Sequence, residues 1–362
     1  MRSLVVLLLL AHASASDLSA QLDKALESVP AGGKAGVAVL DLTTDSWLYL
    51  ADSDRPLSLA STTKLLIAAA SFAQFGPQYQ FSTRMVALGP QQGDSVPGLG
   101  IIGGGDPCLD GHFYDDDPDQ AFLQWATHCK RLGIVRVAGD IVVDARLFAG
   151  PIRPSTYPQD VENQQRWYSA PASAFAWNDN CIEVRVVPTV PGHPADVQVR
   201  PHSARIQIRN LTRTTAGKGD SRFSVTRDGD QNIVTVSGTY AKATAWFPLA
   251  IATDPDLLAA DHLKSLFERS GITVTGNVRL GSVDAGAGPL LVDLRHDLVP
   301  ALTLMNQHSQ NFYAEQMLRL VGARRGGDGS IDSGRRAVLE ILAGPLGTSA
   351  STLTLLDGSG LS

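Results

Sequence analysis

Apolar residues occur in short runs whose spacing changes twice along the chain, and the first part of the pattern predicts a hairpin and a helix. Residues 34–42 are apolar and β-branched, residues 43–45 have the composition of a turn, and residues 46–50 are apolar again. This alternation predicts a β-hairpin. The sequence STTKLLIAAASFAQ, which begins at Ser61 and precedes Gly76 and Pro77, predicts a helix that is buried in a core.

The next two hundred residues have a different pattern, in which short runs rich in Val and Ile are separated by Gly, Pro and Asp. These runs predict strands at residues 135–143, 181–187, 197–199, 206–208, 223–226 and 233–236. Helical patterns interrupt them at residues 120–132 and 257–270. The runs have no fixed period, so they do not indicate a repeat array.

Helical spacing returns near the end, at residues 299–307, 311–322 and 332–343. Both ends of the chain are therefore of one type, and the β-rich middle separates them. This order predicts an α+β domain that is split by a large, mostly β insertion. We expect its first part at residues 16–82, the insertion at 83–289 and its second part at 290–362.

The first fifteen residues have the pattern of a secretory signal peptide. A charged start at Arg2 precedes an apolar run from Leu4 to Ala11, and small residues follow at positions 13–15. The alternative is a buried N-terminal helix. No later stretch has the roughly 18 unbroken apolar residues of a spanning helix, so we expect an exported chain without a transmembrane anchor.

Composition narrows the class of protein. Hydrophobic residues make up 44% of the chain and charged residues 18%, and the formal net charge is -6. These values indicate a globular protein without the basic surface that nucleic acid requires. The three cysteines, Cys108, Cys129 and Cys181, are too few for a fold built on disulfides and do not have the spacing of a zinc site.

A possible metal-ligand cluster is His112 with the carboxylates of residues 115–117. Consecutive carboxylates close to a proline are more typical of a solvated loop. We therefore expect no metal at these residues.

The strongest chemical signal is the pair Ser61 and Lys64 at the start of the predicted buried helix. Residues three apart lie on one helical face, so the lysine amine can reach the serine hydroxyl. Apolar surroundings lower the pKa of a lysine and allow it to act as a base toward a serine nucleophile. The alternative is that Ser61 is only an N-cap and that Lys64 is solvated.

A second signal is Ser309 with Asn311, in the break between two predicted helices. A hydroxyl and an amide that project to the same side could relay a proton and hold a substrate. The alternative is that one of these residues only caps the following helix.

Serine-x-x-lysine at the start of a helix, followed after a long β-rich stretch by serine-x-asparagine between helices, resembles the class C low-molecular-mass penicillin-binding proteins. These are serine D-alanyl-D-alanine carboxypeptidases and endopeptidases. Further matching stretches are GGGDP at residues 103–107, YSAP at 168–171, NDN at 178–180 and DGSGLS at 357–362. They extend over almost the whole chain after the predicted signal peptide.

The resemblance implies a penicillin-binding-protein/β-lactamase-like catalytic domain and a role for each of the four site residues. Ser61 would be the acylated nucleophile, Lys64 its general base, Ser309 a proton shuttle and Asn311 a partner of the substrate backbone. The acyl transfer that the resemblance implies needs no metal and no organic cofactor. It also implies peptidoglycan stem peptides and cross-links as substrates, β-lactams as acylating inhibitors, and a periplasmic or secreted location. The alternatives are a catalytically impaired wall-binding homologue, and a β-lactamase or esterase with the same nucleophile.

The third motif of the family, Lys-Thr-Gly or Lys-Ser-Gly, does not occur in residues 1–362. In the family its strand pairs with the first strand of the hairpin and contributes an oxyanion-hole amide. Loss of one such donor can reduce the rate about 10²- to 10³-fold, and an unpaired edge strand invites aggregation. We therefore expect residues 1–362 by themselves to be weakly active and poorly stable.

Overall fold

The computed structural model describes residues 15–217, 223–347, 349 and 353–362. Most of the predicted signal peptide, residues 1–14, lies outside the described residues. The chain divides into two compact units, residues 1–59 and residues 60–362. Within the described parts of both, no helix combines the length and the apolar character that crossing a bilayer requires.

The first unit contains a helix and the predicted hairpin. Helix α1 spans Ala15–Leu26, strand β1 spans Val37–Asp41, and strand β2 spans Ser46–Ala51. The two strands pair antiparallel, with a register shift after Val39. The carboxylate of Asp41 accepts the backbone N–H of Thr43 at 2.8 Å, which orders the turn. The hairpin prediction is confirmed, whereas α1 was not predicted.

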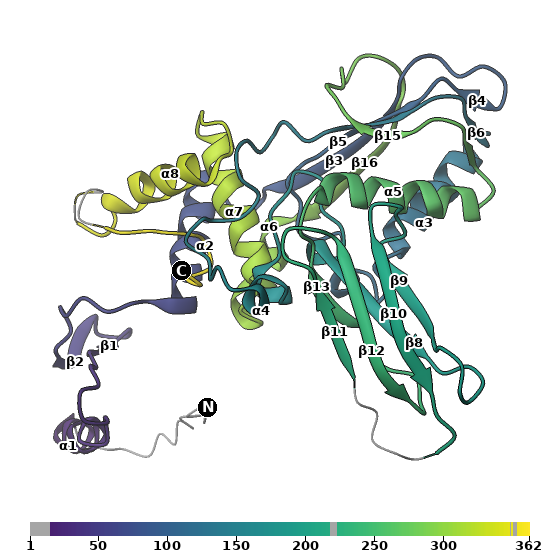
Figure 1. Ribbon diagram of the computed structural model, residues 1–362. Coiled ribbons are helices and arrows are strands. Elements are labelled where there is room, and N and C mark those ends of the chain that lie inside the picture. The colour runs from purple at the N-terminus through teal and green to yellow at the C-terminus, as the bar shows by residue number, and fades with distance from the viewer. Residues whose placement is uncertain (1–14, 218–222, 348, 350–352) are drawn as a thin grey trace. The chain divides into compact units, whose positions relative to one another are not determined.

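The second unit contains a group of helices packed around one buried helix (Figure 1). Its members are α2 (Thr63–Phe75), α6 (Leu298–Gln307), α7 (Asn311–Arg324) and α8 (Ile331–Ala343), and one 3-10 turn, Ala60–Thr62, precedes α2. Residues 311–322 of α7 are buried throughout. All four predicted helices are confirmed within about two residues, which is the usual uncertainty of a helix end.

The prediction that α2 is buried in a core is confirmed only in part. The helix packs against α6, α7 and α8, and Ile67 and Ala70 belong to their common core. Leu65 and Phe72 remain 59% and 40% exposed. Lys64 nevertheless lies on the buried side, at 1% exposure.

A five-stranded mixed sheet forms the centre of the second unit. Its order is β15–β7–β5–β3–β16, with bounds Val278–Leu280, Ile141–Asp144, Leu99–Ile102, Gln80–Ala87 and Leu290–Asp297. The first three strands run parallel, and β3 and β16 are antiparallel to their neighbours. One face of this sheet packs on α3 (Gln120–Arg131) and α5 (Pro255–Arg269) and forms the largest apolar core.

The run at residues 135–143 was predicted as one strand, and this is wrong. It forms β6 (Arg136–Val137) and then β7, and β6 pairs with β4 (Ser95–Val96) and β14 (Thr273–Val274) in a separate small sheet. A Cβ atom at Gly139 would lie 2.4 Å from the carbonyl oxygen of Pro97. The backbone therefore crosses closely at this point, and the chain changes sheets there.

Two three-stranded sheets, β13–β8–β9 and β10–β12–β11, enclose a core of their own and extend away from the central sheet (Figure 1). Their bounds are Cys181–Val187 (β8), Asp196–Arg200 (β9), Gln207–Thr214 (β10), Ser224–Arg227 (β11), Ile233–Tyr240 (β12) and Phe247–Ala250 (β13). The short elements are α4 (Val161–Gln164) and 3-10 turns at Gly111–Phe113, Trp167–Ser169 and Asn178–Asn180. The predicted strands of this region are confirmed.

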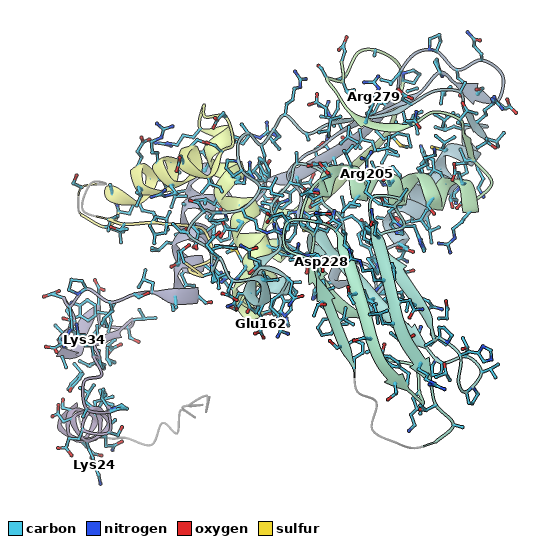
Figure 2. All side chains as sticks on the ribbon, in the orientation of Figure 1. Lys24, Lys34, Glu162, Arg205, Asp228 and Arg279 are labelled. Atoms are coloured by element: carbon cyan, nitrogen blue, oxygen red, sulfur yellow. The ribbon has the colours of Figure 1, made fainter. Side chains whose placement is uncertain are left out.

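Charged side chains on the outside of the second unit form local pairs. Figure 2 labels Arg205, Asp228 and Arg279, whose partners are Asp261, Arg209 and Asp140 at 2.7–3.2 Å. All three cysteines are buried and free. An arginine in such a local ion pair has fewer N–H donors available for a ligand.

The fold is mixed α+β, as predicted. The predicted divisions at residues 82 and 290 fall inside β3 and at the first residue of β16, and these two strands pair with each other. The assignment of residues to a catalytic domain and an insertion stays a prediction.

Candidate active site

The start of α2 is shaped by a close approach of another segment. Ala60 has φ +46°, a left-handed conformation that is uncommon for a residue with a Cβ atom. Gly360 lies against it, and a Cβ atom at Gly360 would be 1.8 Å from the carbonyl oxygen of Ala60. Only glycine fits at position 360, so residues 357–362 pass directly over the first turn that carries Ser61.

The amine of Lys64 is the centre of the site. Its Nζ lies 3.2 Å from Oγ of Ser61, 2.7 Å from Oδ1 of Asn311 and 2.8 Å from the carbonyl oxygen of Ser359. The last two atoms can only accept hydrogen bonds, whereas a hydroxyl can donate or accept. A neutral amine would therefore use its two N–H groups on Asn311 and Ser359 and direct its lone pair at the Ser61 hydroxyl.

Burial affects the pKa of this lysine. Desolvation lowers the pKa of Lys64, and the carboxylates of Glu315 and Asp357 oppose that shift. Lys64 is almost fully buried, whereas Ser61 is exposed. The amine therefore lies inside the protein, and the hydroxyl lies at the solvent-accessible surface.

Asn311 is the first residue of α7 and is held from both ends of its amide. Its Oδ1 accepts from Lys64, and its Nδ2 donates to the carbonyl oxygen of Tyr168 at 2.9 Å. Two partners of opposite type fix the orientation of the amide. The side chain also links α7 to the segment that contains YSAP.

Ser309 lies apart from these contacts. It occupies the break between α6 and α7 with φ +54°, and its side chain is exposed. Within the described residues, no hydrogen bond joins its hydroxyl to Ser61, Lys64 or Asn311. The structure therefore brings together three of the four predicted site residues. The fourth, Ser309, lies outside their hydrogen-bond network.

The sequence analysis missed a second layer of polar groups behind Lys64. Glu315, one turn after Asn311 on α7, accepts from the backbone N–H of Gly358 at 3.0 Å and of Ser359 at 2.9 Å. It also accepts from the hydroxyl of Tyr157 at 2.9 Å, and this hydroxyl lies 2.9 Å from Oγ of Ser359. The spacing of four residues from Asn311 was a usable signal for Glu315, whereas nothing in the sequence indicated Tyr157.

Burial also dominates the charge of Glu315. Desolvation, together with the charge of Asp357, raises the pKa of Glu315 to about 7, although its three hydrogen bonds act in the opposite direction. Asp357 itself accepts from the backbone N–H groups of Gly360 and Ser362 at 2.5 and 2.8 Å. The carboxylates therefore hold residues 357–362 in place over Lys64.

Two groups of potential metal ligands occur among the described residues, and each set lies within 4.8 Å: Asp106, Cys108 and His296, and Asp110, His112 and Asp179. Both ring nitrogens of His296 are engaged, by Asp106 at 2.6 Å and by Tyr114 at 2.8 Å. The carboxylates that lie within ligand distance of His112 are Asp110 and Asp179; of residues 115–117, Asp116 lines the same pocket. Part of each ligand set is thus engaged in hydrogen bonds within the protein.

A serine hydroxyl that faces the amine of a buried lysine can carry out acyl transfer, and this defines the class of site. Residues 18–362 match the D-Ala-D-Ala carboxypeptidase 3 (S13) family. The match covers nearly the whole chain, and the protein belongs to this family.

Curated relatives agree with the family. A D-alanyl-D-alanine carboxypeptidase of Actinomadura sp. is 30% identical over 356 residues, which are 94% of this chain and 62% of the relative. A carboxypeptidase of Mycobacterium tuberculosis is 33% identical over 137 residues, which are 36% of this chain and 28% of that protein. The chain thus spans less than two thirds of the length of either relative.

Solved structures support the fold. Penicillin binding protein 4 from Haemophilus influenzae superposes with a TM-score of 0.72 at 23% identity, over 97% of this chain and 74% of that one. Its complex with a novel β-lactam gives a TM-score of 0.67 with the same identity and coverage. The fold predicted from the resemblance is confirmed.

Proposed function

We propose that the protein is a serine-type D-Ala-D-Ala carboxypeptidase or endopeptidase that acts on peptidoglycan peptides through an acyl-enzyme and is inhibited by β-lactams. The observation that carries the proposal is the 3.2 Å contact between Nζ of Lys64 and Oγ of Ser61, made by a lysine that is 1% exposed. Family membership and the carboxypeptidase names of the two relatives support it.

In the proposed first step, Oγ of Ser61 attacks the carbonyl carbon of the D-Ala-D-Ala bond while the neutral amine of Lys64 takes the hydroxyl proton. The tetrahedral intermediate then collapses, the C–N bond breaks, and the leaving amine takes a proton from the site. An ester on Ser61 remains. Water attacks this ester with the same lysine as base, which releases the acid and restores the hydroxyl.

The surroundings of Lys64 favour this role. An ordinary lysine is almost wholly protonated at neutral pH and cannot accept a proton. Burial lowers the pKa of Lys64, so a larger fraction is neutral. The N-terminal end of α2 adds a favourable potential for the developing oxyanion, worth roughly 0.3 to 1 kcal/mol.

We assign supporting roles to the two residues between α6 and α7. Asn311 orients the lysine amine through Oδ1 and would offer hydrogen bonds to the substrate backbone once its amide is shared with it. Ser309 would pass a proton between Lys64 and the leaving amine. Its exposed position suits contact with a substrate that enters from solvent.

The same proposal extends to substrates, location and domain organisation. Peptidoglycan stem peptides and cross-links would be the substrates, which requires a place of action outside the cytoplasm, reached as a periplasmic or secreted protein through the signal peptide. Residues 16–82 and 290–362 would contribute to the catalytic domain, and residues 83–289 would form the insertion.

Labelling with a fluorescent penicillin tests the proposal directly. We expect one covalent label per chain in the 362-residue protein and none in Ser61→Ala. Ser58→Ala, an exposed serine three positions earlier, is the matched control and should label like the wild type. Labelling is followed to completion, because residues 1–362 by themselves are expected to be weakly active. Label retained in Ser61→Ala would remove Ser61 as the nucleophile, and a wild type that never labels would contradict acylation of the 362-residue protein.

A further inference from the structure

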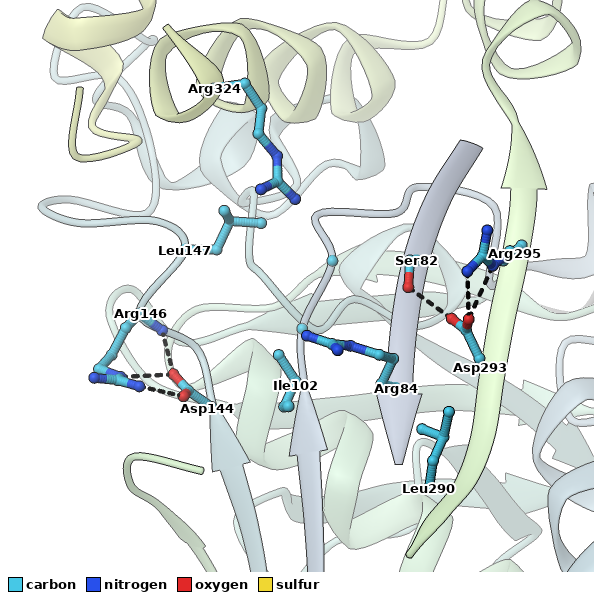
Figure 3. Close-up of a pocket in the computed structure, with 12 residues that line it drawn as sticks. Ser82, Arg84, Ile102, Asp144, Arg146, Leu147, Leu290, Asp293, Arg295 and Arg324 are labelled. Atoms are coloured by element: carbon cyan, nitrogen blue, oxygen red, sulfur yellow. Dashed lines mark hydrogen bonds and ion pairs between the residues drawn. The ribbon is translucent and has the colours of Figure 1, made fainter. Parts of the chain in front are cut away.

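A charged cavity of about 430 Å³ lies on the face of the central sheet that α3 and α5 do not cover (Figure 3). Side chains alternate between the two faces of a strand. On β3, Met85 therefore points into the large core, and Arg84 points to the opposite face. The residues that give the cavity its charge are four arginines and two aspartates: Arg84, Arg146, Arg295, Arg324, Asp144 and Asp293.

Strand register places several of these residues in one row. Asp144 on β7 pairs with Ile102 on β5, Ile102 pairs with Arg84 on β3, and Arg84 pairs with Asp293 on β16. Partners directly across a ladder share a face of the sheet. Arg84 is therefore the third of four residues in a row that has a carboxylate at each end, and it lies directly opposite Asp293.

Both carboxylates already accept hydrogen bonds from groups other than Arg84. Asp144 accepts from Nε and Nη2 of Arg146 at 2.8 and 2.6 Å, and from the backbone N–H of Val283 at 3.1 Å. Asp293 accepts from the hydroxyl of Ser82 at 2.7 Å, and from Nε and Nη2 of Arg295 at 2.9 and 2.7 Å. Figure 3 shows the contacts of Asp144 with Arg146, and those of Asp293 with Ser82 and Arg295, as dashed lines.

Among the described residues, neither Arg84 nor Arg324 forms an ion pair at contact distance with a carboxylate. Arg84 lies near the charge of Asp293, and Arg324 makes a side-chain hydrogen bond with Tyr79. Figure 3 shows the side chain of Arg84 extending from β3 toward the strand of Ile102, and that of Arg324 extending from α7 toward the cavity. A guanidinium has five N–H donors in a planar fork that matches the oxygens of phosphate or carboxylate. Two such forks therefore face the cavity from two different elements.

We propose that this cavity is a binding site for a phosphate group, held between Arg84 and Arg324. Four arginines and two aspartates leave a local excess of two positive charges, on a chain whose net charge is -6. Donors that arrive from a strand and from a helix suit a tetrahedral anion, which presents oxygens in several directions, better than a planar carboxylate. The site does not depend on the proposed peptidase function.

The phosphate can be a free ion or part of a phosphodiester-linked polymer. The side chains of Arg146 and Arg295 at the rim are 68% and 57% exposed, so the cavity is open to solvent and a phosphate within a chain can reach it. Both sources present the same oxygens to the arginines. They differ in whether neighbouring phosphates add affinity through multivalent contact.

Calorimetric titration of the 362-residue protein at fixed ionic strength tests the site, first with inorganic phosphate and then with a glycerol phosphate oligomer. Fixed ionic strength is required because salt screens exposed charges. We expect saturable binding at one site, and we expect Arg84→Gln and Arg324→Gln each to weaken it about tenfold or more, because each removes hydrogen bonds to a charged ligand. Binding that is tighter per phosphate for the oligomer would assign the site to a polymer, and equal binding per phosphate would assign it to the free ion.

Arg325→Gln is the matched control. Arg325 is the neighbour of Arg324 and carries the same charge, but it contacts Glu340 at 3.5 Å and Gln74 at 3.3 Å and does not line the cavity. Its substitution should leave phosphate affinity unchanged. An equal loss in Arg325→Gln, unchanged affinity in Arg84→Gln, or a wild type that binds neither probe would overturn the proposal.

Discussion

The two regions around Lys64 and Arg84 use a cation in opposite ways. At Lys64, every direction in which the amine can donate meets an acceptor of the protein, namely Ser61, Asn311 and the carbonyl of Ser359. At Arg84, the two carboxylates of the same strand row are engaged by other donors, and the guanidinium remains for a ligand. The first network is closed within the protein, and the second is open.

We expect this difference to affect protein stability at Lys64 and ligand binding at Arg84. In a closed, buried network the pKa values of the members depend on one another and on folding. In an open, solvated arrangement the charge contributes little to folding and is free for binding. Three substitutions test the comparison, from the largest expected effect to the smallest.

Lys64→Arg should reduce the rate constant of acylation by a β-lactam about 10²- to 10⁴-fold, the usual contribution of a general base. The substitution keeps a cation in the network, but a guanidinium cannot lose its proton in a protein. Time courses of fluorescent penicillin labelling measure the effect. Lys130→Arg, at an exposed lysine that donates to the carbonyl of Ser270, should behave as the wild type, and an unchanged rate in Lys64→Arg would exclude the base role.

The pH dependence of the free energy of unfolding tests whether Glu315 belongs to a closed, buried network. Its pKa in the folded protein is about 7, above the ordinary 4.5, so between these pH values the folded state binds more protons than the unfolded state. The free energy of unfolding should therefore fall as pH rises from about 4.5 to about 7, by on the order of 3 kcal/mol from this group. The cost is absent below that window and fully present above it.

Glu315→Gln should remove this part of the pH dependence, since an amide does not titrate. Urea unfolding at several pH values, compared between wild type and variant, isolates the contribution from other titrating groups. Glu340→Gln, at an exposed glutamate, is the control. The same slope in wild type and Glu315→Gln would show that the carboxylate is not held as described.

Arg84→Gln should change the free energy of unfolding by no more than about 0.5 kcal/mol, because Arg84 is only half-buried and forms no ion pair at contact distance among the described residues. The contrast is Arg319 on α7, which is 1% exposed. Its guanidinium donates to the carbonyls of Gly329, Pro151 and Ala149 at 2.8, 3.1 and 2.6 Å. Arg319→Gln should cost about 3 kcal/mol, roughly 1 for each carbonyl left unpaired, and equal costs at both positions would contradict an open arrangement at Arg84.

The elements that sequence patterns predicted are those whose residues all serve one core. Helices α6 and α8 and strands β8 to β12 have an apolar spacing that follows one core. Helix α7 was also predicted, although it carries the buried polar residues Asn311 and Glu315. Strands β3 and β16 were missed because one face of each carries charge, at Arg84, Asp293 and Arg295, where a fully buried strand would carry Val or Ile. Their charged positions were a signal of the cavity that they line.

The candidate site shows the same limit. The pairing of Ser61 with Lys64 is local, because both lie in one turn of helix, and it was predictable from spacing. The contacts of Tyr157 with Glu315 and Ser359 join residues 158 and 202 positions apart. Such pairs depend on how the chain returns to the helix group, which spacing along one sequence does not encode.

The contact between Lys64 and the carbonyl of Ser359 spans 295 positions of the chain, and this has a consequence for biosynthesis. A ribosome adds roughly 5–20 residues per second, and N-terminal parts emerge first. The helix that carries Ser61 and Lys64 is therefore made many seconds before the segment that holds the amine in place. Ser61, the proposed nucleophile, should therefore remain unreactive through most of the translation of the chain. It should become reactive only when residues 357–360 fold against Lys64.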